Sequence, residues 1–109
     1  MMSRWQQLTI YIGETDQWKH QPLYSAIVTL AREHGLAGAT VTRGMAGFGE
    51  KGKIRTANIL ALSIDVPIVI TIIDREDVLT EFIPAIRAMV HSGLITLQPM
   101  TVLKSNVLN

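Results

Sequence analysis

Apolar and polar residues alternate near the beginning of the chain. Leu8, Ile10 and Ile12 are separated by less apolar neighbours. This period of two is typical of a β-strand that has one buried and one exposed face. The pattern therefore predicts a strand over residues 8–12, which Gly13 ends.

Two later segments repeat their apolar residues every three to four positions, the period of an amphipathic helix. The first helix is predicted to have Pro22 in its first turn and to stop at Gly35. The second is predicted to begin at Asp74, whose side chain would cap it, to kink at Pro84 and to end at Gly93. The apolar stripes consist of Leu23, Ile27, Leu30 and Ala31 in the first helix and Leu79, Phe82, Ile83, Ile86 and Met89 in the second. Each stripe is suited to packing one side of its helix against a sheet.

Three further strands are predicted from apolar runs. Residues 39–43 form a short strand, residues 59–73 a long one, and residues 94–97 a last one that is expected to extend as far as residue 103. Pro67 has no backbone N–H, so it marks an edge, a bulge or a restart within the long strand.

The predicted elements follow the order β-α-β-β-α-β without an internal linker. Right-handed connections place both helices on the same face of an antiparallel four-stranded sheet. The sequence therefore predicts an α+β fold, a ferredoxin-like βαββαβ plait, which residues 1–109 form as a single domain.

The opposite face of this sheet has no helix to cover it. The long strand is nevertheless apolar on both sides, because the run from Ile68 to Ile73 contains one polar residue, Thr71. Burying each apolar side chain of the uncovered face would contribute roughly 1.5–3 kcal/mol. A closed homo-oligomer that packs these faces together is therefore expected.

Composition supports this expectation and excludes several classes of function. Hydrophobic residues make up 48% of the 109 residues and charged residues 17%, against a usual charged share of about 25%. A net charge of +1 gives no broad field for nucleic acid. Without cysteine there are no disulfides or thiolate metal sites. No apolar run has the length of a membrane span, so we expect a cytoplasmic protein that does not insert into a membrane.

Candidate chemistry concentrates in residues 44–58, where no period is visible and a long loop is predicted. With Arg43, Lys51, Lys53 and Arg55 against Glu50, this region has a local charge of +3. Glycine exposes backbone amides, and together with basic side chains these favour an anionic ligand such as a phosphate. The alternative is a solvated, mobile loop that binds nothing.

No pattern typical of catalysis or of a metal site is found elsewhere. His34 and His91 fall in the last turns of predicted helices, where the helix dipole favours a cation. His20 has no second ligand at metal spacing. No serine lies in a recognisable nucleophile motif. We therefore expect no catalytic residues, no metal ligands and no enzymatic activity.

Several segments together resemble the PII signalling proteins. Gly47-Phe48-Gly49 after a strand, followed by a polar loop and Val66-Pro67, is similar to the strand, T-loop and strand of PII. The similarity continues through residues 8–14, 22–24, 35–39 and 43–44. Nearly the whole chain therefore resembles an uncharacterised branch of the nitrogen regulatory PII-like superfamily.

The resemblance implies a homotrimer that binds an adenine nucleotide as effector in clefts between subunits. It also implies that residues 44–58 act as a flexible, T-loop-like segment that regulates a partner, such as a transporter, a channel or an enzyme. Glu50 and Lys51 replace an Arg and the magnesium-binding Gln of PII, which argues against a PII-type magnesium-ATP site. The loop charges and the resemblance together predict these ligand-binding residues: Arg43, Gly47, Phe48, Gly49, Lys53 and Arg55.

Two rival functions remain open. A divalent-metal-handling trimer similar to the cation tolerance proteins would require clustered His and carboxylate ligands. A small nucleotide-dependent enzyme would require a base near the glycines, for which Glu50 and Asp74 are the candidates. The leading hypothesis is a non-enzymatic PII-like regulatory protein whose long loop responds to a small anionic effector.

Overall fold

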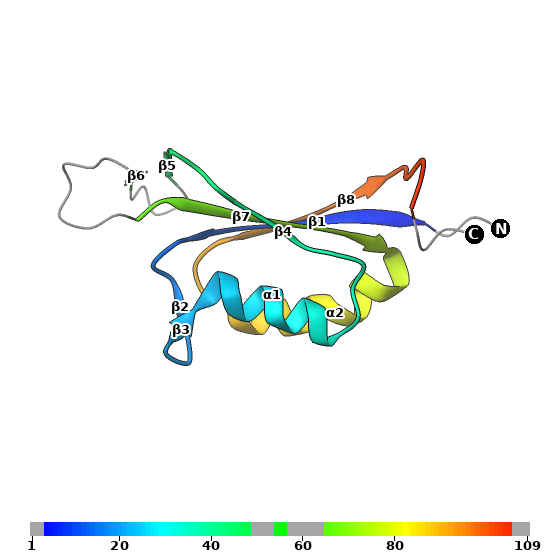
Figure 1. The fold of residues 1–109 in the computed structure, drawn as a ribbon, viewed down its shortest axis with the longest axis horizontal. Helices are drawn as coiled ribbons and strands as arrows, with labels where there is room; N and C mark the ends of the chain where they lie inside the picture. The colour runs from blue at the N-terminus through cyan, green and yellow to red at the C-terminus, as the bar shows by residue number, and fades with distance from the viewer. Residues whose placement is uncertain (1–3, 49–53, 57–64, 106–109) are drawn as a thin grey trace.

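A single antiparallel sheet with two helices on one face forms the body of the protein (Figure 1). The computed structural model describes residues 4–48, 54–56 and 65–105. The sheet strands are β1 (Trp5–Gly13), β4 (Thr40–Arg43), β7 (Pro67–Arg75) and β8 (Leu94–Met100), and the helices are α1 (Leu23–Glu33) and α2 (Glu76–Met89). The strand order β4-β7-β1-β8 is that of a ferredoxin-like plait, so the predicted fold class is confirmed.

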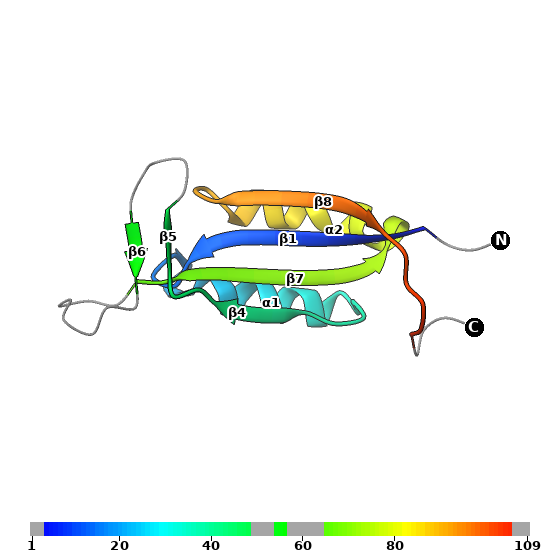
Figure 2. The ribbon, with the colours of Figure 1, turned by 90° about the horizontal axis from the view of Figure 1, so that it is seen from above.

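The central pair of strands fixes the register of the sheet. β1 pairs with β7 along its whole length, from Trp5 opposite Arg75 to Gly13 opposite Pro67. β8 pairs with the other edge of β1, and β4 with the other edge of β7. Seen from above, the four strands lie side by side over the two helices (Figure 2). The described connections between neighbouring strands therefore lie at the two ends of the sheet.

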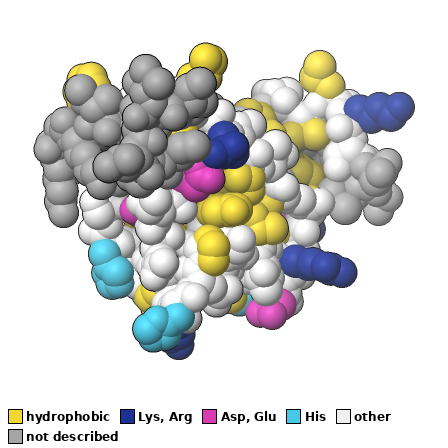
Figure 3. All heavy atoms as spheres, turned by 60° about the vertical axis from the view of Figure 1, so that its left-hand side comes forward, with side chains coloured by type: hydrophobic (Ala, Val, Ile, Leu, Met, Phe, Trp, Pro, Cys, Tyr) yellow, Lys and Arg dark blue, Asp and Glu magenta, His cyan; other side chains and the backbone are white. Residues whose placement is uncertain are grey.

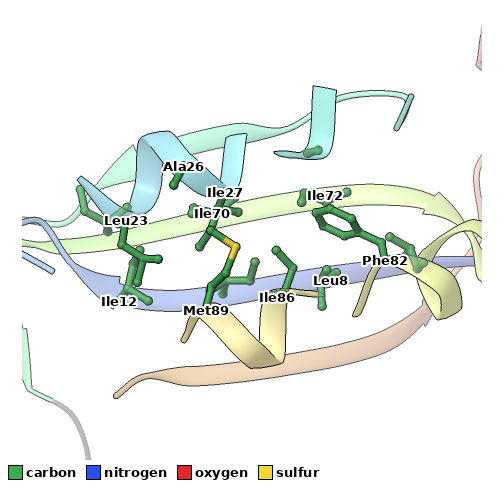
Figure 4. Packing of buried hydrophobic residues seen from close by; sticks show 14 of the residues in the cluster. Leu8, Ile12, Leu23, Ala26, Ile27, Ile70, Ile72, Phe82, Ile86 and Met89 are labelled. Carbon is green, nitrogen blue, oxygen red and sulfur yellow. The ribbon is translucent and has the colours of Figure 1, made fainter. Parts of the chain in front are cut away.

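The core lies between the sheet and the helices. Both predicted helical stripes contribute to it, and residues from β1 and β7 complete it (Figure 4). The largest fully buried side chains are Phe82, Leu8, Ile10, Ile27, Ile68, Ile70, Ile72, Leu79, Ile86 and Val66. Each fully buried side chain of this size contributes roughly 1.5–3 kcal/mol, so this layer holds most of the stability of the subunit.

The face of the sheet opposite the helices is mixed rather than apolar. Its β7 residues Val69, Thr71 and Ile73 are half-buried, as the alternation predicts. Tyr11 is 43% exposed and Leu94 48%. One row of residues, directly paired across all four strands, consists of Thr40, Thr71, Thr9 and Thr96. The sequence could not reveal this row, because it depends on the register between strands that are distant in the chain.

The start of the second helix differs from the prediction. β7 continues through Asp74 to Arg75, and α2 begins at Glu76 without a side-chain cap. Asp74 is 5% exposed. Its Oδ2 accepts the N–H of Ala37 at 2.8 Å, and its Oδ1 accepts the N–H of Arg75 at 2.7 Å. Asp74 therefore attaches the segment after α1 to the sheet, because its side chain points to the helical side of β7.

The predicted strand boundaries also need correction. Residues 59–64 of the predicted long strand lie outside the described residues, and the described part of the strand begins at Pro67. A strand start is a favourable place for a residue without a backbone donor. The last strand ends at Met100 instead of reaching residue 103. Helix α2 contains Pro84 at an interior position, and the kink expected there stays a prediction.

Two short hairpins were not predicted. The first consists of β2 (Gln17–Trp18) and β3 (Gln21–Pro22), joined by Lys19 and His20 with φ of 48° and 67°. Such turns usually carry Asn or Gly, so the sequence gives no hairpin signal here. Pro22 belongs to β3 and immediately precedes α1 rather than lying within its first turn.

The second hairpin lies within the predicted irregular loop. It pairs β5 (Ala46–Phe48) with β6 (Ile54–Thr56). Three residues, one of them Gly47, are too few to show a period of two. The described part of the loop is therefore more regular than its composition predicts.

Candidate functional site

The candidate site lies where β4 ends and β7 begins. The N–H of Gly44 donates a hydrogen bond of 2.7 Å to the carbonyl of Pro67. A Cβ atom at Gly44 would lie 3.2 Å from the Pro67 side chain, and one at Gly47 would lie 3.1 Å from it. These are tight contacts, so the two glycines allow the chain that follows β4 to pack closely against Pro67.

The turn after β1 contacts the segment that leads into β7. The N–H of Glu14 donates to the carbonyl of Val66 at 2.9 Å. The N–H of Thr15 donates to Oδ1 of Asp65 at 3.3 Å. Two hydrogen bonds close the turn itself. The N–H of Gly13 donates to Oδ2 of Asp16 at 2.9 Å, and the N–H of Asp16 donates to the carbonyl of Gly13 at 3.1 Å. The first residues after β1 are thus held against residues 65–66.

The side chain of Glu14 joins this turn to β4. Nη2 of Arg43 lies 3.0 Å from Oε1 and 2.8 Å from Oε2 of Glu14. The carboxylate is more enclosed than the guanidinium, with side-chain exposures of 28% for Glu14 and 60% for Arg43. Because one nitrogen makes both contacts, the remaining N–H groups of the guanidinium lie outside this pair. Figure 3 shows basic and acidic side chains side by side at this end of the molecule.

The predicted ligand-binding residues are only partly brought together in the described structure. Arg43 ends β4, and Gly47 pairs with the backbone of Arg55 across the β5–β6 hairpin. Phe48 is 77% exposed. Gly49 and Lys53 lie outside the described residues, as does the side chain of Arg55.

Glu14 was missed by the sequence reasoning. Its contact with Arg43 spans 29 positions along the chain, and no local pattern identifies such a partner. The sequence does show an acidic residue immediately after a strand that ends at glycine. Its pairing with Arg43 became apparent only from the register that places the end of β1 near the end of β4. The charge of the candidate site is therefore more balanced than the basic loop alone suggests.

A second group of polar and aromatic residues lies on the helical side. The rings of Trp18 and His91 have centroids 6.3 Å apart and planes inclined at 32°. Nζ of Lys19 lies 5.3 Å from the centre of the Trp18 ring, a cation–π distance. These contacts attach the β2–β3 hairpin to the segment between α2 and β8. Since Trp18 also packs against the core, they have a structural explanation.

Gly93 positions this segment against β1. A Cβ atom at Gly93 would lie 2.6 Å from the carbonyl oxygen of Tyr11, a distance that real Cβ atoms do not reach. Glycine is therefore required for the turn between α2 and β8 to approach the sheet.

Within residues 4–48, 54–56 and 65–105, no group of three or more His, Cys, Asp or Glu side chains is arranged to hold a metal ion. Neither α1 nor α2, nor any other helix in the described part of the chain, combines the length and apolarity needed to cross a bilayer.

The chain matches a known protein family along most of its length. The model of a protein family, DUF190, described as "Uncharacterized ACR, COG1993", matches residues 5–102. The chain belongs to the DUF190 family. A UPF0166 protein from Aquifex aeolicus (strain VF5) is 36% identical over 96 residues, which cover 88% of this chain and 90% of that protein. One from Methanocaldococcus jannaschii is 30% identical over 98 residues, covering 89% and 90%.

The DUF190 chain also resembles solved structures of CPII, a nitrogen regulatory PII-like protein from Thiomonas intermedia K12. The CPII structure bound to ADP, AMP and bicarbonate has a TM-score of 0.63 at 20% identity, with 93% of this chain and 90% of that chain covered. The structure bound to ADP and bicarbonate has a TM-score of 0.61 at 19% identity, with the same coverage. At this identity the likeness shows that this chain shares its fold with the PII-like protein CPII. The predicted membership of a family of unknown function is confirmed by the match to DUF190.

Proposed function

We propose that this DUF190 protein is a non-enzymatic, PII-like regulatory protein. It binds a small anionic effector, an adenine nucleotide or a related oxyanion, in clefts between the subunits of a homotrimer. Residues 44–58 then engage or release a partner protein, which would be a transporter, a channel or an enzyme. The fold shared with CPII supports this assignment, because CPII carries ADP, AMP and bicarbonate in the similar structures.

The observation that carries the proposal is the position of Arg43 in this fold. Its guanidinium stands at the beginning of the long loop and already contacts two oxygens of a carboxylate. Charge-assisted contacts of this kind are stronger than neutral hydrogen bonds and suit carboxylate and phosphate groups. Lys53 and Arg55 are proposed to add positive charge, and Gly47, Phe48 and Gly49 to supply the backbone of the binding loop.

The composition of the open sheet face supports self-association. Among the described strand residues that alternate onto this face, Arg75 is the one charged residue, and it lies at the far end of β7. Uncharged hydroxyl, amide and apolar groups are less costly to desolvate than ions. Three copies are proposed to pack these faces together, which would also form the clefts between subunits.

Isothermal titration calorimetry with ADP, AMP and sodium bicarbonate tests the proposal. We expect saturable binding by the unmodified protein and loss of at least tenfold in affinity in Arg43→Gln, since a charged hydrogen bond contributes about 1.5–3 kcal/mol. Arg32→Gln is the matched control, because Arg32 is exposed in the last turn of α1. Binding of no probe, or equal loss in both variants, would refute the assignment.

Two further measurements address the rival functions and the assembly. ADP formation from ATP above the background rate would favour an enzyme, and saturable binding of divalent cations alone would favour the metal-handling alternative. Sedimentation equilibrium at micromolar concentration is expected to give the mass of three subunits. A stable single subunit would contradict the proposed clefts.

A further inference from the structure

We propose that Glu14 is an internal competitor for the oxyanion group of the effector. This inference rests on the proposed function, since it concerns the same Arg43. In the structure, the Glu14 carboxylate presents both of its oxygens to Nη2 of Arg43, at 3.0 and 2.8 Å. A bicarbonate ion or a phosphate group presents the same pattern of adjacent, negatively charged oxygens. A ligand that binds Nη2 of Arg43 therefore replaces Glu14 at that nitrogen, and the protein exchanges one carboxylate-like partner for another.

The exposure of the pair makes this exchange feasible. The Arg43 side chain is 60% exposed and the Glu14 side chain 28%, so water reaches both partners. Ion pairs in such surroundings contribute little net stability, because solvation of the separated charges offsets their attraction. A ligand that binds with ordinary strength can displace Glu14 without a large cost to the fold.

The backbone of Glu14 connects this exchange to β7. Its N–H bonds to the carbonyl of Val66 at 2.9 Å, while its side chain contacts Arg43. A single residue thus links the end of β4 to the residue that precedes β7. When the ligand takes the guanidinium, the side-chain link to β4 is lost and the backbone link to Val66 remains. The ligand therefore changes how the end of β4 is attached to the turn after β1.

Competition also sets the chemical class of the ligand. If a neutral group replaced Glu14 at the guanidinium, the charges of Arg43 and of Glu14 would both be left unpaired. Only an anion with at least two accessible oxygens compensates Arg43 for the loss of Glu14. The site therefore selects bicarbonate or the phosphate group of a nucleotide over the uncharged nucleoside.

The test compares Glu14→Gln with Asp77→Asn. Glutamine keeps the shape of the glutamate side chain and removes its charge. Asp77 is the matched control because it also pairs with an arginine, at 3.7 Å from Nε of Arg75, but lies beyond the opposite end of β7. Affinities for sodium bicarbonate, inorganic phosphate, ADP and adenosine are measured by calorimetry for the unmodified protein and both variants.

Removal of the competitor is expected to strengthen oxyanion binding by about three- to fivefold in Glu14→Gln, and Asp77→Asn should stay within twofold of the unmodified protein. Adenosine should show no gain in any variant. Which of the three oxyanions gains most identifies whether a bicarbonate or a phosphate group occupies Arg43. Glu14→Ala, which removes the carboxylate altogether, is expected to repeat the gain.

The possible failures are distinguishable. If neither the unmodified protein nor Glu14→Gln binds any oxyanion, the proposed function and the role of Glu14 both fall. If the unmodified protein binds and Glu14→Gln binds equally well, the role of Glu14 alone falls. The carboxyl ¹³C signal of Glu14 supplies a second readout in the unmodified protein. It should move on saturation with ADP or bicarbonate, and an unchanged signal would also overturn the inference.

Discussion

Two carboxylates attach connecting segments to opposite ends of the same sheet, and their surroundings differ sharply. Asp74 is buried at the end of β7 and accepts two backbone N–H groups, those of Ala37 and Arg75. Glu14 follows β1 at the other end and contacts the largely exposed side chain of Arg43. The Asp74 carboxylate is shielded from water and accepts two backbone N–H groups, whereas the guanidinium beside Glu14 is open to water and to other anions. We therefore expect the first attachment to be structural and the second to be exchangeable.

The largest effect is expected from removing the buried carboxylate. Asp74→Ala removes the acceptor of two part-buried backbone N–H groups, and a hydrogen bond to a charged group contributes about 1.5–3 kcal/mol. We expect the free energy of unfolding to fall by about 2–4 kcal/mol. Urea denaturation monitored by circular dichroism measures this loss, and a loss below that of Glu14→Gln would contradict the comparison.

A second effect tests how rigidly the turn between α2 and β8 packs against β1, the strand that leads to Glu14. Gly93→Ala places a Cβ atom 2.6 Å from the Tyr11 carbonyl oxygen, and forcing apart packed groups costs about 1–3 kcal/mol. The midpoint of urea unfolding should fall accordingly. Gly38→Ala is the control, because a Cβ atom there would meet nothing within 4 Å. Equal effects in the two variants would show that the turn after α2 yields easily.

The exchangeable carboxylate should matter little for stability. Glu14→Gln removes an exposed ion pair, and such pairs contribute about 0.2–1 kcal/mol. We therefore expect a change of less than about 1 kcal/mol in the free energy of unfolding. If the free energy of unfolding fell as much as in Asp74→Ala in the same urea titration, Glu14 would be a structural residue and its contact with Arg43 would not be exchangeable.

The smallest effect concerns salt. At 1 M ionic strength the Debye length is about 3 Å, so the remaining contribution of the Glu14–Arg43 pair should largely disappear. The difference in unfolding free energy between the unmodified protein and Glu14→Gln is expected to shrink toward zero from 0.1 to 1 M NaCl. The difference for Asp74→Ala should persist, because the Asp74 side chain is buried and is screened much less by salt. Parallel urea titrations at both salt concentrations decide between these outcomes.

The fold was predictable because its signals are local. The alternation around Ile10 and the helical stripe around Phe82 each reflect one element, and the order of elements with right-handed connections leaves few topologies. The core therefore followed from periodicity alone. The Lys19–His20 turn escaped prediction because its backbone conformation is normally adopted by other residue types.

The candidate site was less predictable because it depends on pairing between distant segments. Arg43 was identified from the charge of its neighbours, but its partner Glu14 belongs to another strand end. Asp74 was assigned to a helix cap because helix starts favour such residues. Its true partners became apparent only from the side of β7 on which it lies. The residue types were recognised correctly, but the partners of Arg43 and Asp74 depend on strand register and on the side of the sheet to which each side chain points.

The threonine row across the open sheet face has a consequence for the life of a newly synthesised subunit. A hydroxyl both donates and accepts. In the single subunit the hydroxyl of the buried Thr9 accepts a hydrogen bond from Nε2 of Gln7, while Thr40, Thr71 and Thr96 remain accessible to water. The same groups can later bond to one another or to a neighbouring copy without leaving an ion stranded. A purely aliphatic face would favour non-specific association as soon as the chain left the ribosome. The threonine row therefore helps to keep the subunit soluble before it associates with other copies.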